Sequence, residues 1–464
     1  MNIKFIKSLT TLIYTINSFI LLLDKEDKRK SLIIFFFILI GTFLEMLSLG
    51  LLFPIIQLIL NDNFISDQLF ILNIKNYFNL SENAFIIFTL LFLIFVFLIK
   101  NVILVFIIIV RAKFIEDLRK KTSKQLYLKY LNQNFTFFIN RNSSELIRNL
   151  HQEIPKLIQG IDGILIFFTE ILILIGMSLV LLYISPYTTI IIILSIIFLL
   201  IFYLTITKKK IFNLGKNDQI LYSNILKETQ QGFGNFKEIF IYSLKDTFLF
   251  QFTEILIKYC KNNRILSIFQ QLPRIIFEQF GIFLIIGISI FIFSQEVDKT
   301  KALAIIGVYA YAFFRLLPSI NKMIVNIQLF IFVKPSSDII NKELNLNTNL
   351  ISKLANDEKI KFQKEIELKD INYNVDSKNK TILENINLKI NKNSKIGIVG
   401  ETGSGKSTLL NIIMGLLEPT SGSIIIDGKN IISHSVNWRK KISFVSQSTY
   451  LLDDSILNNI NFNQ

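Results

Sequence analysis

The residues best suited to chemistry form one short stretch, GETGSGKS, from Gly400 to Ser407. It fits the pattern G-x-x-x-x-G-K-[ST], in which glycines leave backbone amides open to nucleotide phosphates. In this pattern Lys406 places its charge on the β and γ phosphates, and Ser407 ligates Mg²⁺. The sequence therefore predicts a Mg-nucleotide site made by Gly400, Glu401, Thr402, Gly403, Ser404, Gly405, Lys406, Ser407 and Thr408.

The segments around this loop indicate an α/β domain. A β-type run, Lys395–Val399, precedes the loop and the apolar helix TLLNIIMGLL follows it, so bound phosphates would lie at a helix N-terminus. Two further β-type runs, Glu365–Asn374 and Ile382–Ile390, come earlier. We expect residues 364–464 to form this domain, and the polar residues 334–363, which lack a clear period, to form a linker.

The rest of the chain is strongly apolar. Its 464 residues are 51% hydrophobic, more than is usual for a soluble globular domain, and the mean hydropathy is +0.49. The apolar residues gather into stretches suited to cross a hydrocarbon core of about 30 Å. We expect residues 31–333 to form an α-helical polytopic membrane domain with six spans. These spans are Ser31–Leu60, Phe85–Val110, Ile161–Ile184, Thr188–Ile206, Ile275–Phe293 and Ala302–Phe332.

Lysine and arginine are distributed unevenly between the two sides of these spans. Residues 1–30, 111–156 and 207–274 carry six, ten and eleven of them, whereas the connections on the opposite side carry three in total. This positive-inside asymmetry predicts that both chain termini are cytoplasmic, in a multi-pass protein of the cell (inner) membrane. It also accounts for most of the +15 net charge, so the charge does not require a nucleic-acid partner.

Cysteine and histidine offer little other chemistry. The single cysteine, Cys260, excludes an internal disulfide framework and a multi-cysteine metal site. The two histidines, His151 and His434, lie far apart without metal-ligand spacing, and we interpret both as ordinary polar positions.

Amphipathic segments flank and interrupt the spans. Residues 5–23 have apolar side chains at three- and four-residue spacing, which predicts an interfacial helix within residues 1–30. A signal peptide is the alternative, but a charged run follows in place of a small-residue cleavage site. In the two long cytoplasmic connections, the sequence predicts short helices near residues 140–150 and 230–248; solvated hairpin tips are the alternative.

Taken together, the spans and the loop resemble the ATP-binding cassette (ABC) transporters, in the arrangement of exporter-type half-transporters. Downstream of the loop, LLEPTSGSIIIDGKNI with a hairpin turn at Asp427-Gly428, and KISFVSQSTYLLDDSILNNI, resemble the corresponding segments of that family. The resemblance implies that Gln447 reaches Mg²⁺ and the attacking water, and that Tyr373 stacks on the adenine of ATP. It further implies that segments near residues 142–146 and 233–239 are coupling helices. Two subunits, most simply a homodimer, would sandwich the ATP.

The sequence departs from the family pattern after Gln447. A signature of LSGGQ type, an apolar strand ending in Asp-Glu and a switch histidine do not follow, and His434 precedes Gln447 and so does not fill that role. The chain therefore supplies groups that bind Mg-ATP without the full set for ABC-type ATP hydrolysis. We expect a nucleotide-binding domain truncated after the glutamine loop, with a natural short form as the alternative.

Ionisable residues within the spans are candidates for a substrate path, because charges inside a membrane are costly. Glu45, Glu278 and Arg315 are the candidates, and Glu170 is also in a span; structural pairing is the alternative for Glu278 and Arg315.

Patterns around these charges resemble exporters that flip lipid-linked oligosaccharides or polysaccharide intermediates. We therefore expect ATP-driven export or flipping of a hydrophobic or lipid-linked substrate across the bilayer. The alternatives are a lipid or multidrug exporter and, if the short chain is natural, a non-hydrolysing nucleotide-sensing membrane subunit.

Overall fold

The computed structural model describes residues 23–51, 55, 73, 75–77, 81–294, 299–346, 362–375, 380–430, 435–447 and 451–461. The chain divides into two compact units, one of residues 1–127 and 143–345 and the other of residues 128–142 and 346–464. Nearly all of the expected interfacial helix lies outside the described residues, as does His434.

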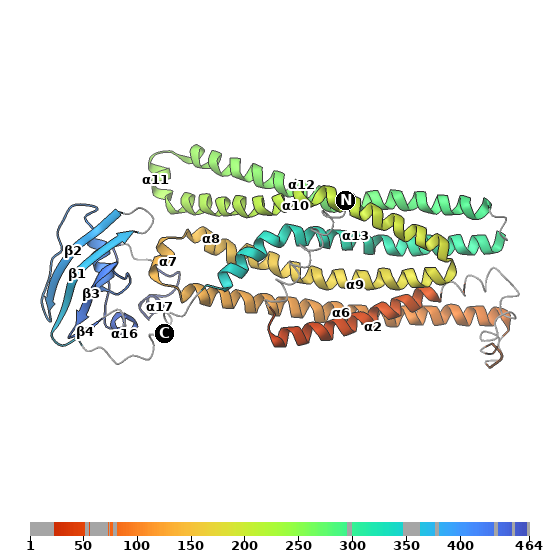
Figure 1. Ribbon diagram of the computed structural model, residues 1–464, viewed down its shortest axis with the longest axis horizontal. Coiled ribbons are helices and arrows are strands. Elements are labelled where there is room, and N and C mark those ends of the chain that lie inside the picture. Colours follow the sequence, from red (N-terminus) through yellow and green to blue (C-terminus); the bar gives the residue numbers. More distant parts are fainter. Residues whose placement is uncertain are drawn as a thin grey trace. The chain divides into compact units, whose positions relative to one another are not determined.

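The first unit is built from long helices (Figure 1). Six helices in the described part of the chain are long and apolar enough to cross a membrane, as the sequence predicted. Three of them have 49 or 50 residues, about 75 Å at 1.5 Å per residue, more than twice the thickness of a hydrocarbon core. The six helices are α2 (Lys25–Gly50), α6 (Glu82–Leu131), α9 (Ile154–Ile184), α10 (Pro186–Gly234), α12 (Lys245–Ser294) and α13 (Lys299–Leu344).

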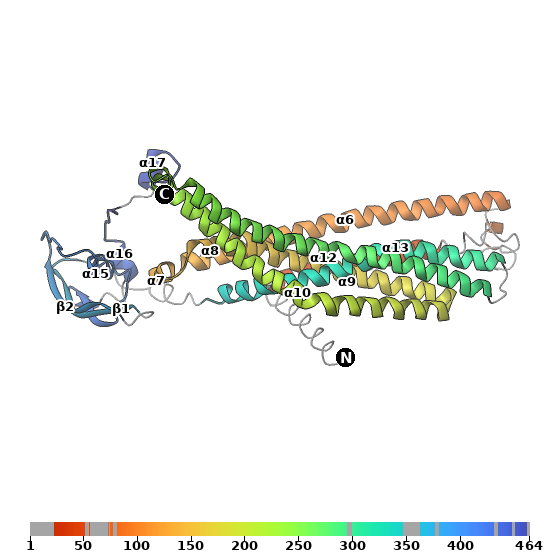
Figure 2. The same cartoon turned by 90° about the horizontal axis from the view of Figure 1, so that it is seen from above.

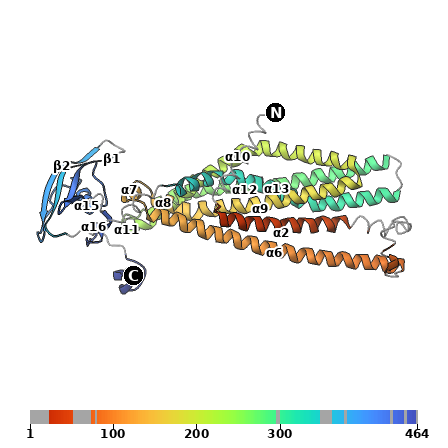
Figure 3. The ribbon, with the colours of Figure 1, turned by 60° about the horizontal axis from the view of Figure 1, so that its bottom comes forward.

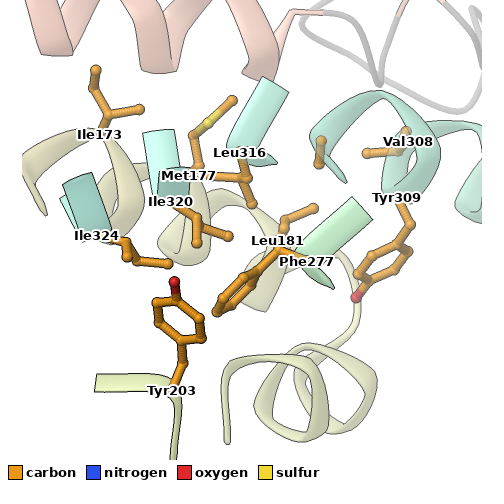
Figure 4. Packing of buried hydrophobic residues seen from close by; sticks show 11 residues of the cluster. Ile173, Met177, Leu181, Tyr203, Phe277, Val308, Tyr309, Leu316, Ile320 and Ile324 are labelled. Carbon is orange, nitrogen blue, oxygen red and sulfur yellow. The ribbon is translucent and has the colours of Figure 1, made fainter. Parts of the chain in front are cut away.

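Apolar side chains hold four of these helices together. Helices α9 and α13 pack against each other, and α10 packs against α12; Figures 1 and 2 show α10 and α12 as long neighbours. The rings of Tyr203 and Phe277 lie beside each other in the shared core (Figure 4). Helix α2 runs alongside α6 and α9 (Figure 3), where Ile38, Ile107 and Leu165 are buried together.

A buried polar network also joins α9, α10 and α13. The ammonium group of Lys156 pairs with the carboxylate of Asp218, which also accepts a hydrogen bond from Gln152. Nearby, the amide of Gln219 donates to Glu153 at 2.9 Å and to the hydroxyl of Ser336 at 3.4 Å. Because Asp218 and Glu153 are 2% and 0% exposed, their charges depend on these partners.

Short helices connect the long ones at one end of this unit. Helix α8 (Ser143–Arg148) continues into a π-helix, η1 (Asn149–Glu153), and α11 (Phe236–Ile241) joins α10 to α12. These elements lie in the two regions where the sequence predicted short helices. A further short helix, α7 (Phe135–Ile139), belongs to the second unit and was not predicted; Asn134 caps it by accepting a hydrogen bond from the amide of Phe137.

The second unit contains a four-stranded antiparallel sheet in the order β2-β1-β3-β4. Leu409 and Ile412 of helix α15 pack with the apolar face of the sheet and with Trp438. The hairpin predicted at Asp427-Gly428 joins β3 to β4, and both turn residues have positive φ, 46° and 85°. The elements are β1 (Glu365–Val375), β2 (Lys380–Asn391), β3 (Ser421–Ile426), β4 (Lys429–Asn430), α15 (Lys406–Ile413), α16 (Ser435–Arg439) and α17 (Ile456–Asn461).

The carboxylate of Asp427 fastens this hairpin to the start of β1. It accepts backbone hydrogen bonds from Gln363, from Lys364 at 2.9 Å and from Glu365 at 2.8 Å. Desolvation is the largest single influence on Asp427 and acts to raise its pKa, but the hydrogen bonds from these three amides together outweigh it and hold the pKa below its usual value.

Two expectations about secondary structure were wrong. The run Lys395–Val399 forms no strand of the described sheet, and Val399 is 96% exposed, because no described strand pairs with it. The linker does not begin at residue 334, because α13 continues through Pro335 to Leu344. Burial of Ser336, Ser337 and Ile340 explains how packing keeps this polar, proline-containing stretch helical.

Candidate functional site

The predicted phosphate loop joins the core to the N-terminus of α15. Gly405 occupies the N-cap with φ 87° and ψ 10°, a left-handed conformation that a side chain disfavours. A Cβ there would also lie 2.9 Å from Leu383 and 3.0 Å from Ile382. Gly403 has φ 89° but open space around it, so conformation alone accounts for a glycine at that position. The loop can therefore turn its amides outward at the start of a helix, where an anion is favoured.

Lys406 holds the loop through backbone carbonyls. Its ammonium group donates to the carbonyl oxygens of Gly400 at 2.8 Å and Glu401 at 2.7 Å. The side chain is partly buried, while Ser407 is exposed at the first turn of α15. A nucleotide phosphate can replace the carbonyls as partner of Lys406, and the exposed hydroxyl of Ser407 fits a Mg²⁺ ligand.

Tyr373 lies one strand away from the loop. It pairs with Leu383 across β1 and β2, and Leu383 contacts the position of Gly405. The tyrosine ring is partly buried against the core of this unit. Tyr373 therefore lies near the loop, on β1, next to the strand β2 that contacts the loop.

The structure does not bring Gln447 to the loop by any described contact. Gln447 is exposed and follows the extended segment 442–446, in which Val445 is 91% exposed. Among the hydrogen bonds of the described residues, none joins Gln447 to Lys406 or Ser407.

Of the three candidate substrate-path residues in the membrane helices, Glu45 and Arg315 contact each other, whereas Glu278 lies apart from them. Glu45 of α2, 3% exposed, forms an ion pair with Arg315 of α13. Glu278 is exposed on α12, and the ion pairs of the described residues do not include it. A second pair joins Glu170 of α9 to Lys322 of α13 at 3.0 Å.

The role of Lys322 was not predicted from the sequence. The available signal was spacing, because Lys322 follows Arg315 by seven residues and two helical turns bring both to one side of α13. Its partner was not predictable, because Glu170 is 152 residues away in the chain.

Comparison with known proteins now identifies the family. The model of the ABC transporter transmembrane region matches residues 31–314, and the ABC transporter model matches residues 383–463. This chain belongs to the ABC transporter family. The second match includes the whole phosphate loop and Gln447.

Individual relatives are named for multidrug resistance, toxin translocation and lipid flipping. The multidrug resistance-like ATP-binding protein MdlA of Buchnera aphidicola is 27% identical over 72% of this chain and 58% of its own length. The alpha-hemolysin translocation ATP-binding protein HlyB of Escherichia coli is 40% identical over 25% of this chain and 16% of its own length. The ATP-dependent lipid A-core flippase of Wigglesworthia glossinidia is 37% identical over 21% of this chain and 17% of its own length.

The fold is also that of a solved exporter. A bacterial Atm1-family ABC exporter with ATP bound superposes with a TM-score of 0.72 and 14% identity, covering 95% of this chain and 75% of that one. The six-helix membrane domain followed by part of a nucleotide-binding α/β domain is therefore confirmed as the fold class. The chain spans at most 58% of the length of these three curated relatives.

Proposed function

We propose that this chain is the membrane domain and the ATP-binding part of an ATP-driven exporter or flippase that works as a dimer. The observation that carries this proposal is the joining, in one chain, of six membrane-length helices to a phosphate loop at the start of α15. ATP binding would favour the association of two nucleotide-binding domains, and this association would move the long helices.

In the proposed ATP site, each residue has a distinct role. The loop amides and Lys406 hold the phosphates, and Ser407 and Gln447 ligate Mg²⁺. Tyr373 stacks on adenine, and Gln447 also positions water. The proximity of Tyr373 to the loop through Leu383 supports its role, whereas the role of Gln447 rests on its place in the family pattern.

The short helices are proposed to couple the two units. Residues 128–142, which include α7, group with the nucleotide-binding residues rather than with the membrane helices. Within this group, the ammonium group of Lys129 donates to the carbonyl of Leu346 at 3.4 Å. We therefore assign the first coupling element to α7 together with α8, and the second to α11.

The proposed substrate is hydrophobic or lipid-linked, with a lipid-linked oligosaccharide or polysaccharide intermediate as the favoured class. The charged residues inside the membrane helices support a substrate with a polar part. A lipid or multidrug exporter is the second candidate, supported by the names of the MdlA and lipid A-core flippase relatives. The proposed location is the inner membrane, with both termini cytoplasmic.

Nucleotide binding tests the core of this proposal. A fluorescent ATP analogue should bind the purified chain in the presence of Mg²⁺, and Lys406→Ala should weaken binding about tenfold or more, since a charge-assisted contact is lost. Lys395→Ala, which removes an exposed lysine outside the loop pattern, is the matched control. Equal binding by the wild type and both variants would refute the assigned site.

ATP turnover separates the exporter from a nucleotide sensor. In proteoliposomes of a protein that joins the signature, the Asp-Glu strand and the switch histidine to this chain, hydrolysis stimulated by a lipid-linked oligosaccharide supports the favoured substrate, whereas stimulation by simple amphiphiles alone supports the second candidate. Tight ATP binding by that completed protein without any hydrolysis would instead support the nucleotide-sensing subunit.

The single cysteine gives a direct test of orientation. Cys260 is exposed on α12, in a connection that the charge asymmetry places in the cytoplasm. A membrane-impermeant maleimide should therefore label it only after the cells are permeabilised. Labelling in intact cells would reverse the proposed topology.

A further inference from the structure

One side of α13 presents an unusual combination of residues for a membrane helix. Phe314 is 71% exposed, and the side chain of Lys322 is 57% exposed two turns further along. Arg315 lies beside them with a side chain that is 29% exposed. We call this surface the α13 stripe; it consists of Tyr311, Phe314, Arg315, Pro318 and Lys322.

The two ion pairs of this stripe have a common orientation. In each pair the acid is buried, with side chains 4% and 5% exposed for Glu45 and Glu170, whereas the cation is the more exposed partner. A molecule approaching the open side of α13 therefore meets ammonium and guanidinium groups before it meets carboxylates. The stripe therefore presents positive charge at its surface even though each pair is neutral.

Both cations keep hydrogen-bond donors for a ligand. A lysine ammonium has three donors, and a guanidinium has five. The contact of Lys322 with Glu170 uses one donor, and that of Arg315 with Glu45 is made through one nitrogen. The pairs can therefore remain in place, keeping the buried acids neutralised, while the remaining donors bind an anion.

Buried polar atoms behind the stripe lack partners in the described structure. The Oε2 atom of Glu170 and the hydroxyl of Ser319, which is 0% exposed, have no hydrogen-bond partner among the described atoms. Such atoms are rare in folded proteins, because a buried polar atom without a hydrogen bond has lost its contact with water and gained nothing in return. The two unpartnered atoms are therefore suited to bind the polar groups of a ligand or the water that accompanies it.

The remaining stripe residues suit a hydrocarbon chain. Phe314 and Tyr311 lie one and four residues from Arg315, whereas Lys322 lies seven residues, or about 10 Å, along the helix. The stripe thus has an aromatic part and a cationic part, which matches the two parts of an amphiphile with a negative head group.

We propose that the α13 stripe binds the phosphate head group of an anionic lipid amphiphile. Arg315 and Lys322 donate hydrogen bonds to the phosphate oxygens, and Phe314 and Tyr311 contact the hydrocarbon part. The inference rests on the proposed export function, for which this amphiphile is the transported substrate, and it specifies the sign and chemistry of the substrate head group.

Exchanging the two residues of one ion pair tests whether this site prefers a negatively charged head group. Native mass spectrometry of the full chain in detergent measures retained phosphatidylglycerol against phosphatidylcholine. The exchange Glu170→Lys with Lys322→Glu keeps an ion pair but makes the exposed partner acidic. We expect the preference of the wild type for phosphatidylglycerol to fall about tenfold, as expected for loss of one charged hydrogen bond.

Two controls separate binding from stability. The exchange Glu254→Lys with Lys258→Glu alters an ion pair on α12 that is exposed at both ends, and should leave the preference unchanged. If the exchanged α13 pair does not fold, the neutral pair Glu170→Gln with Lys322→Gln should give the same loss. Inorganic phosphate at equal concentration should not displace the lipid, because it lacks a hydrocarbon part.

Several results would overturn the proposal. An unchanged lipid preference in both folded α13 variants would mean that the Glu170–Lys322 ion pair stabilises the fold and does not bind lipid. Cross-linking of two copies through Phe314→Cys in a Cys260→Ser background, with no lipid preference in the wild type, would assign the stripe to a subunit contact. Loss of ATP-analogue binding with a retained lipid preference would refute the export proposal while supporting the lipid site.

Discussion

The phosphate loop and the α13 stripe place positive charge in opposite ways. In the loop, the ammonium group of Lys406 donates to the carbonyls of Gly400 and Glu401, six and five residues away in the chain. In the stripe, Lys322 is satisfied by a carboxylate 152 residues away on another helix. The loop is therefore a local device that a short motif encodes, whereas the stripe exists only after the helices have packed.

Because of this contrast, mutations in the two regions should change different properties of the protein. Changing the loop should alter nucleotide binding with little effect on the membrane helices, because its contacts stay within the second unit. Changing a buried ion pair should alter helix packing, because the surviving charge has no water to solvate it. Two optical signals separate these effects. Trp438, the single tryptophan, is buried in the nucleotide-binding core, and far-ultraviolet circular dichroism reports mainly the long helices.

The largest effect is expected from a more deeply buried pair of the helical unit. Lys156→Met removes the partner of Asp218, whose side chain is 3% exposed, and should destabilise this unit by about 3 kcal/mol or more. The helical transition in circular dichroism should move to lower temperature, while the Trp438 transition stays in place. Lys258→Met, at an exposed pair, should change stability by no more than about 0.5 kcal/mol. Equal shifts in the two variants would contradict the assigned importance of burial.

A glycine series in the loop should have the next largest effect. Gly405→Ala combines an unfavourable φ of 87° with close contacts to Leu383 and Ile382. It should weaken binding of an ATP analogue about tenfold or more, because the left-handed conformation alone costs a side chain about 1–2 kcal/mol. Gly403→Ala, with open space, should have a smaller effect. Gly397→Ala, where neither strain nor contact is present, should bind like the wild type. Equal effects at Gly397 and Gly405 would contradict the loop geometry.

The pair at the α13 stripe should be less sensitive than the pair at Lys156. Lys322→Met removes a partner of Glu170, but the side chain of Lys322 is 57% exposed against 16% for Lys156. Because the ammonium group of Lys322 can be solvated when the ion pair is broken, the pair contributes less to stability. We therefore expect Lys322→Met to destabilise the helical unit by about 1 kcal/mol. Circular dichroism melting in detergent measures both variants. A larger loss for Lys322→Met than for Lys156→Met would show that exposure does not rank these pairs.

The sequence predicted the local features of this molecule better than the long-range ones. The phosphate loop, the Asp427-Gly428 hairpin and the six spans follow from spacing, turn chemistry and hydropathy within short windows. The partners of Glu45 and Glu170 do not, because they depend on which helices pack together. The run Lys395–Val399 has a β-type composition but forms no ladder in the described sheet, since a strand also requires a neighbour. The polar stretch from residue 334 was predicted to be a linker, yet burial of Ser336, Ser337 and Ile340 keeps α13 helical through Pro335 to Leu344.

The smallest effect concerns a charge held by backbone amides rather than by a cation. The carboxylate of Asp427 has a lowered pKa because hydrogen bonds from three amides together outweigh desolvation. Its contribution to stability is therefore complete above the unfolded pKa of about 3.9 and is lost as the pH falls through the lower folded value.

Asp427→Asn should remove this pH dependence, with a small loss of stability at neutral pH because the amide oxygen still accepts. Urea unfolding followed by Trp438 fluorescence at pH 6 and at pH 3 tests this: the difference between wild type and variant should shrink at the lower pH. Glu384→Gln, at an exposed position of β2, is the control and should show no such trend. A constant difference at both pH values would mean that Asp427 acts through hydrogen-bond geometry and not through charge.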